Sequence, residues 1–141
     1  MSGERERDDG LIATLVAARR EPARARLTGL LEAAGGIEVV GEAATGVQVV
    51  VLAHRTRPDV VLIDSTDDRG ALEVTPQLLR ALNGVGAEVL VLGRFERGHD
   101  VLPVWRHGIS GVVDMDVSPA ELLWAVRMSA CGTAFFMPSR S

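Results

Sequence analysis

The sequence predicts a single α/β domain built on a doubly wound, five-stranded parallel sheet with helices on both faces. Five short apolar runs recur along the 141 residues, and segments with helical periodicity separate them. That alternation is typical of a parallel sheet with crossover helices. Two of the runs, 60–63 and 89–92, are continuously apolar rather than alternating, as expected for strands covered on both faces.

The five predicted strands are, in chain order, Leu11–Ala17, Ile37–Ala43, Asp59–Asp64, Glu88–Leu92 and Gly111–Val113. In a doubly wound sheet, functional groups gather where the parallel strands end at their carboxyl edge. The residues that follow the first, third, fourth and fifth strands are therefore the candidates for a functional site.

Five helices are predicted between and after the strands. They cover Glu21–Ala34, a segment from the Thr45 cap to about Arg57, Leu72–Leu82, a short segment from Asp100 to Gly108, and Ser118–Gly132. The last helix has the clearest start, because Ser118 and Glu121 are spaced as a capping box, with Pro119 at the first helical position.

Composition limits the class of protein. A length of 141 residues with 47% hydrophobic content suits one domain with one core. The net charge of −4 gives no basic field for nucleic acid, so DNA contact is expected only through an output domain. The single Cys131 excludes an internal disulfide and fits a reducing cytoplasm. No apolar run reaches the roughly 18 residues that a membrane span needs.

The ends of the chain differ from the domain. Residues 1–10 are mostly charged, and we expect a disordered tail rather than a signal peptide. The domain then spans 11–138, and 139–141 form a second tail or the start of a linker. His54, His99 and His107 are far apart in the sequence, and their spacing fits no metal motif.

Several segments together carry a family resemblance. They are Leu30–Ala33, Ile37–Ala43, Arg57–Asp64, Gly108–Gly111 and Ser118–Leu122. In these segments the chain resembles receiver domains of response regulators, especially the NarL/FixJ group of transcription regulators. The resemblance covers about Leu11 to Pro138. It implies a flavodoxin-like receiver topology and a role in two-component signal transduction.

Receiver domains of this family accept a phosphoryl group on an aspartate, and the resemblance gives that position to Asp64. The other parts of the family's site align with residues of different chemistry: the acidic pair with Ala18 and Arg19, the hydroxyl with Gly93, the aromatic with Val112 and the lysine with Met115. All 15 basic residues are arginine, so the sequence contains no lysine at any position.

These replacements predict that Mg²⁺ binding is lost and that Asp64 is a vestigial phosphoacceptor. Mg²⁺ prefers several oxygen ligands, whereas a guanidinium at Arg19 repels a cation. Asp64 is expected to form hydrogen bonds, or to pair with Arg19 at the strand ends. Asp67 and Asp68 could replace the lost acidic pair, but a solvated acidic loop is the simpler interpretation.

A basic cluster follows the first predicted strand, formed by Arg19, Arg20, Arg24 and Arg26. Arg24 and Arg26 are expected to face solvent from the first helix. Arg19 and Arg20 stay open to an anionic ligand or partner. The strand ends offer no nucleophile–base pair and no glycine-rich phosphate loop, so an enzyme is not expected.

The last predicted helix has two apolar faces. One is formed by Leu122, Val126 and Ser129, and the nearly opposite one by Trp124, Met128 and Cys131. The first is expected to pack on the sheet, and we interpret the second as an interface for a homodimer or another protein partner. The alternative is that a terminal segment with Phe135 and Phe136 folds back over it.

The sequence thus predicts a cytoplasmic pseudo-receiver, a regulatory and dimerisation module that works without phosphorylation. Two alternatives stay open: a phosphoacceptor with a remodelled site at Asp64, and a sensor that binds a small molecule in the vacated pocket near Arg19, Asp64, Gly93 and Met115. Any DNA-binding output domain would lie outside this chain, unless the receiver acts alone. The arginine-only basic set and the many alanines suggest a high-GC bacterium.

Overall fold

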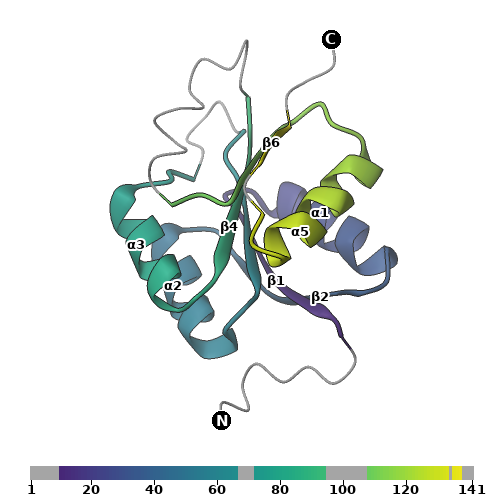
Figure 1. The fold of residues 1–141 in the computed structure, drawn as a ribbon. Helices are drawn as coiled ribbons and strands as arrows, with labels where there is room; N and C mark the ends of the chain where they lie inside the picture. The colour runs from purple at the N-terminus through teal and green to yellow at the C-terminus, as the bar shows by residue number, and fades with distance from the viewer. Residues whose placement is uncertain (1–9, 67–71, 95–107, 134, 138–141) are drawn as a thin grey trace.

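The computed structural model describes residues 10–66, 72–94, 108–133 and 135–137. They form one six-stranded sheet in the order β2-β1-β3-β4-β5-β6, in which all neighbouring strands are parallel (Figure 1). The strands are β1 (Ile12–Ala18), β2 (Ile37–Ala43), β3 (Val60–Asp64), β4 (Glu88–Gly93), β5 (Gly111–Asp114) and β6 (Phe135–Met137). The five predicted strands are all confirmed.

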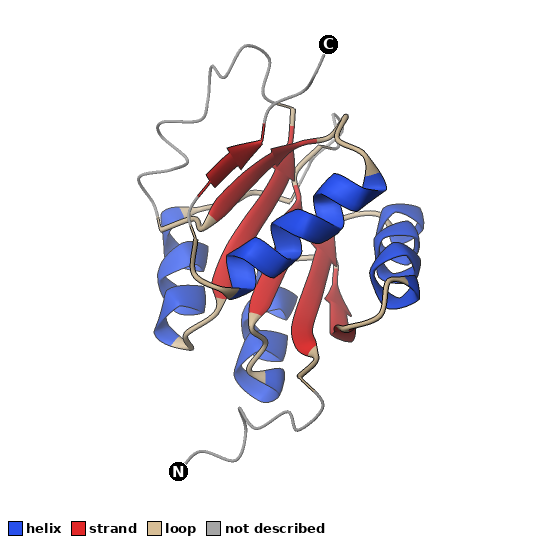
Figure 2. Cartoon of the chain, turned by 45° about the vertical axis from the view of Figure 1, so that its right-hand side comes forward, coloured by secondary structure: helices blue, strands red, loops and turns tan. Residues whose placement is uncertain are grey.

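In the described part of the chain, four helices cover the sheet, and Figure 2 shows them on both of its faces. They are α1 (Glu21–Ala33), α2 (Gly46–Thr56), α3 (Pro76–Gly84) and α5 (Pro119–Ala130). The helices α1 and α5 lie on one face, and α2 and α3 lie on the other. The doubly wound architecture is therefore confirmed. Two predicted segments lie outside the described residues: the N-terminal tail up to Asp9 and the helix from Asp100 to Gly108, of which only Gly108 is described.

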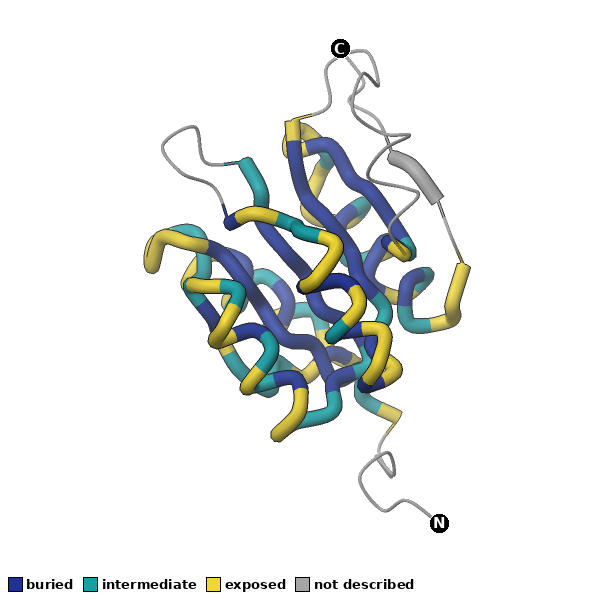
Figure 3. The backbone as a smooth tube through the Cα atoms, turned by 90° about the vertical axis from the view of Figure 1, so that its left-hand side faces the viewer, coloured by how far each residue is buried: buried dark blue, intermediate teal, exposed yellow. Residues whose placement is uncertain are grey.

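The core consists of two apolar layers, one on each face of the sheet. Successive strand residues alternate between them: Leu15 packs with α2 and α3, whereas Val16 packs with α1 and α5. All five residues of β3 are buried, which explains the continuous apolar run in the sequence. Figure 3 shows the central strands in the dark blue of buried residues, between helices that carry exposed residues in yellow.

Helix α3 starts later than predicted. The sequence predicted a helix from Leu72, but the helix begins at Pro76. Thr75 is the N-cap, and its hydroxyl accepts a hydrogen bond from the Leu78 N–H (3.1 Å). Proline is favoured at the first helical position, so Thr75-Pro76 sets the start. Leu72 is buried in the extended segment before the helix.

Strand β6 was not predicted as part of the sheet. Its backbone pairs with β5, with Gly111 opposite Phe135 and Val113 opposite Met137. This pairing places the segment at the sheet edge, so the alternative in which it folds back over the outer face of α5 is not supported. Among the described residues, no helix has the length and apolar character to cross a membrane.

Candidate functional site

The strand ends bring the predicted site residues together at the carboxyl edge of the sheet. Ala18 lies opposite Asp64 in the β1–β3 register. The Met115 N–H donates to the Gly93 carbonyl (2.9 Å), which joins the ends of β4 and β5. A cavity of about 250 Å³ opens at this edge, and its lining includes Ala18, Arg19, Asp64 and Met115. Four of the residues predicted for the vacated site therefore line one cavity, whereas Gly93 is not in its lining.

The Asp64 carboxylate is held by a residue that the sequence analysis did not single out. Asp64 is only 5% exposed. Its Oδ1 accepts hydrogen bonds from the Thr66 N–H (2.9 Å) and the Thr66 hydroxyl (2.6 Å). The predicted ion pair between Arg19 and Asp64 is wrong, because in the described part of the chain the carboxylate is bonded by Thr66 instead. A threonine two residues after an aspartate is a recognisable signal for such a local turn.

Thr66 itself is linked to the neighbouring strand end. The Arg94 Nε donates to the Thr66 carbonyl (3.2 Å), and the Ser65 N–H donates to the Leu92 carbonyl (2.7 Å). The turn after β3 is thus connected to the end of β4 by two hydrogen bonds. These contacts help to fix the position of Asp64 at the end of β3.

Three arginines line the strand-end cavity together with Asp64. They are Arg19, Arg20 and Arg26. In a site that holds a divalent cation, carboxylate and carbonyl oxygens would occupy such positions. Guanidinium groups repel a cation, so the chemistry of this lining does not fit Mg²⁺. Asp67 and Asp68 lie outside the described residues.

Arg24 does not have the solvent-facing role that the sequence predicted. Its Nη1 donates to the carbonyl oxygens of Ala18 (2.9 Å) and Arg19 (3.1 Å), and its Nε lies 3.7 Å from the Glu42 carboxylate. Glu42 also accepts from the Thr28 hydroxyl (2.8 Å). Arg24 therefore clamps the end of β1 to α1 and β2. From its position on α1, Arg24 contacts the ends of the strands. The spacing of the arginines in the sequence does not indicate this contact.

The remaining positions of the family's site are filled without polar side chains that could reach a phosphoryl group. Val112 is fully buried in the layer under α2 and α3, and Gly93 has no side chain. Met115 is 38% exposed at the cavity. A second buried carboxylate, Asp114, ends β5 directly before Met115 and accepts a hydrogen bond from the Asp116 N–H (3.0 Å).

The outer face of α5 lies apart from this pocket. Trp124 is 47% exposed, Met128 is half-buried and Cys131 is exposed. The opposite face, with Leu122, Ala125, Val126 and Ser129, is buried. The predicted division of α5 into two faces is confirmed, and the use of the outer face as an interface stays a prediction. His54 is exposed on α2, and the other two histidines lie outside the described residues.

No family model matches the chain, but individual proteins do. The response regulator protein VraR of Staphylococcus aureus (strain NCTC 8325 / PS 47) is 30% identical over 119 residues, which cover 84% of this chain and 56% of that protein. The crystal structure of the response regulator ChrA of a haem-sensing two-component system is 27% identical, with a TM-score of 0.70, and the match covers 89% of this chain and 60% of that one.

A two-component response regulator of the LuxR family from Aurantimonas sp. SI85-9A1 has the same fold, with a TM-score of 0.77 and 24% identity over 91% of both chains. Fold and sequence together support a receiver domain of the response-regulator class. The chain spans about half the length of the curated relatives that it matches.

Proposed function

We propose that this chain is a pseudo-receiver, a regulatory module of two-component signalling that acts through protein contacts rather than through phosphorylation. The observation that carries the proposal is the lining of the strand-end cavity, where the described residues include three arginines and one aspartate. The chain would act in the cytoplasm and pass its signal to a partner or an output domain outside this chain. Any contact with DNA would belong to that output domain.

The electrostatics of the pocket support the loss of phosphoryl transfer. Transfer to a carboxylate depends on a cation that neutralises the developing charge. Ala18 offers a methyl group and Arg19 a guanidinium where the family has an acidic pair, so the chain has no ligands for that cation at these positions. Asp64 already receives two hydrogen bonds from Thr66, which hold it in one arrangement.

The residues with which the family binds and reports the phosphoryl group are also replaced at the aligned positions. Gly93 lacks a hydroxyl, Met115 lacks an ammonium group, and Val112 is a small buried side chain instead of an aromatic ring. A phosphoryl group on Asp64 would find no group at these positions that changes its contacts. We infer that the domain keeps one conformation and serves as a scaffold.

The outer face of α5 supports a role in dimerisation. Trp124 is a large side chain that is nearly half exposed, and partly exposed tryptophans are enriched at protein interfaces. Met128 and Cys131 extend the same face. We propose that a second copy of the chain, or another protein, packs on this face.

The test is phosphorylation itself. The full chain is incubated with Mg²⁺ and acetyl phosphate, and its intact mass is measured together with that of an Asp64→Asn control and a receiver that has the complete acidic pair. We expect the mass of this chain to stay unchanged while the complete receiver gains a phosphoryl group. Gain of a phosphoryl group that Asp64→Asn abolishes would establish the remodelled phosphoacceptor instead.

A second candidate function, sensing of a small molecule, is favoured by the strand-end cavity. Arg19, Arg20 and Arg26 would suit an anionic ligand. Because a ligand that binds only the folded state raises the melting temperature, screening small anions by thermal denaturation tests this reading. A rise that Asp64→Asn or Arg26→Ala alters would place the ligand in this cavity.

A further inference from the structure

We propose that the groove between α2 and α3 is a second binding site, which takes a small amphipathic anion with an apolar body and one carboxylate head. The groove has a volume of about 870 Å³; it shares Arg19 with the strand-end cavity, and its other lining residues are different. Ligand pockets for small molecules have volumes of about 300–1,000 Å³. The groove is therefore large enough for a bound metabolite.

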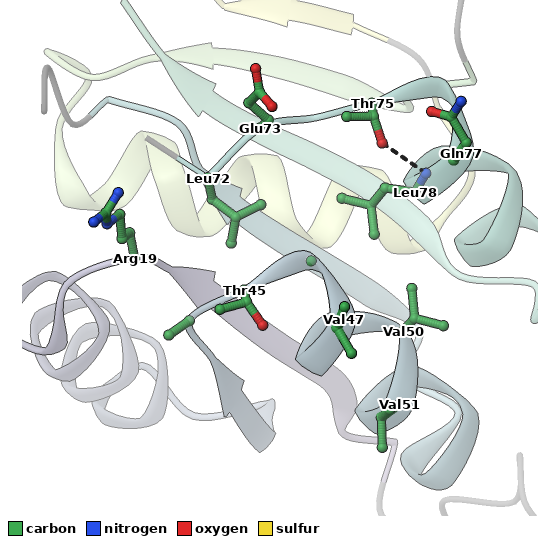
Figure 4. Close-up of a pocket in the computed structure, with 12 residues that line it drawn as sticks. Arg19, Thr45, Val47, Val50, Val51, Leu72, Glu73, Thr75, Gln77 and Leu78 are labelled. Atoms are coloured by element: carbon green, nitrogen blue, oxygen red, sulfur yellow. Dashed lines mark hydrogen bonds between the residues drawn. The ribbon is translucent and has the colours of Figure 1, made fainter. Parts of the chain in front are cut away.

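The walls of the groove are apolar and come from two elements. Val47, Val50 and Val51 contribute from α2, and Leu72 and Leu78 contribute from the segment around α3. Figure 4 shows Leu72 and Leu78 extending toward α2. Both leucines are buried, so they form a floor, while the valines form an open side.

The exposure of this apolar surface is the observation that indicates a binding site. Val47 is 75% exposed and Val51 is 44% exposed, and they are two of the four large hydrophobic side chains that stand exposed in the described part of the chain. Two such side chains on one wall of one groove form a patch, not scattered residues. Contiguous apolar patches of this kind mark binding sites.

One end of the groove is electropositive. Arg19 lies at that end (Figure 4). Helix α2 begins at Thr45 in the same lining, and a helix N-terminus carries a partial positive charge. Thr75, the N-cap of α3, lies on the other side of the view from Arg19 in Figure 4. The threonine hydroxyls already accept from Gln48 N–H (3.2 Å) and Leu78 N–H (3.1 Å), so they cap their helices.

The described lining also includes an acidic residue, Glu73. Its carboxylate points away from the α2 valines in Figure 4. A guanidinium has five N–H donors, so Arg19 can bind a carboxylate in addition to the contacts that it already makes. The cationic end and the apolar walls of the groove match a ligand with a single anionic head and an aliphatic tail.

The test uses octanoate as the probe and octylammonium, of equal chain length and opposite charge, as its control. The full chain carries ¹³C-labelled valine methyl groups, and both probes are titrated below their micellar concentrations. We expect octanoate to shift the methyl signals of Val47, Val50 and Val51 to saturation, and octylammonium to bind more weakly. No saturable shift, or equal affinity for the two probes, would overturn the proposal.

Two variants and a matched control locate the head and the tail. Arg19→Ala should weaken octanoate about tenfold, the size of one charge-assisted hydrogen bond, and should remove the preference over octylammonium. Arg26→Ala changes the same kind of side chain in the other cavity and should leave octanoate binding unchanged. Because Arg19 lines both cavities and Arg26 lines only the strand-end cavity, a loss in Arg26→Ala comparable to that in Arg19→Ala would move the anion to the strand-end cavity and refute the proposed site.

Val47→Asp tests the apolar wall. Val47 is in the first turn of α2, where a carboxylate is favourable with the helix dipole, so the variant is expected to stay folded, which a thermal melt checks. It should abolish octanoate binding, because the new charge lies in the groove and repels the head. Retained binding in the folded variant would contradict the groove as the site.

Discussion

The interior of the sheet and its carboxyl edge have kept the properties of a receiver domain to different degrees. In the interior, β1, β3 and β4 are buried throughout or nearly so, and the strand order β2-β1-β3-β4-β5 is the one expected for the class. At the edge, Asp64 stands at the position of the family's phosphoacceptor, whereas Ala18, Arg19, Gly93 and Met115 differ in chemistry from the residues that the family has there. The difference shows that the apolar pattern determines the fold, whereas a few residues at the strand ends determine the activity.

The largest effect should follow from a change in the interior. Leu62 is fully buried in β3, in the layer under α1 and α5. Leu62→Ala should lower the free energy of unfolding by about 2–5 kcal/mol, because it removes buried methyl groups and leaves a cavity. Urea denaturation followed by circular dichroism measures the loss. A loss below about 1 kcal/mol would show that the interior relaxes around the cavity, and the comparison would weaken.

The outer face of α5 should show the next largest effect, on association rather than on stability. Trp124→Glu should weaken self-association by about 2–4 kcal/mol, the range found for an interface tryptophan. The variant should remain folded, since the side chain is nearly half exposed. Sedimentation velocity compares the two proteins. If the unmodified chain is monomeric at high micromolar concentration, the homodimer has to be abandoned.

A smaller effect is expected at the edge, between Asp64 and Thr66. Asp64→Asn, Thr66→Val and the double variant form a cycle in which the coupling free energy should be about 1 kcal/mol. The matched cycle of Asp64→Asn with Arg19→Ala should be additive, since these side chains form no ion pair in the structure. Strong coupling to Arg19 and none to Thr66 would reverse the assignment of the Asp64 partner.

Most of the fold could be predicted because its signals are local and repeated. The capping box at Ser118 and Glu121 is present as predicted, with both hydrogen bonds formed. The start of α3 was misplaced because Leu72 fits a helical period, although the Thr75-Pro76 cap overrides it. Strand β6 is short, and it depends on pairing with β5 rather than on any local pattern.

The candidate site was only partly predictable. The register of parallel strands places Ala18, Asp64, Gly93 and Met115 at one edge, and this could be inferred from their positions in the sequence. Side-chain partners could not, because Arg24 reaches two carbonyl groups and Glu42 across three elements. The α2–α3 groove could not be predicted because it depends on how two helices pack, and no motif in the sequence indicates it.

The central claim is that the strand-end pocket no longer binds the cation on which receiver phosphorylation depends. Titration of the ¹⁵N-labelled chain with Mg²⁺, in the presence of beryllofluoride, tests it most directly through the amide signals of Asp64, Thr66 and Met115. We predict that these signals do not show saturable shifts at millimolar Mg²⁺, because guanidinium groups line the pocket. Saturable shifts centred on Asp64, absent in Asp64→Asn, would contradict the account and make this domain a working phosphoacceptor.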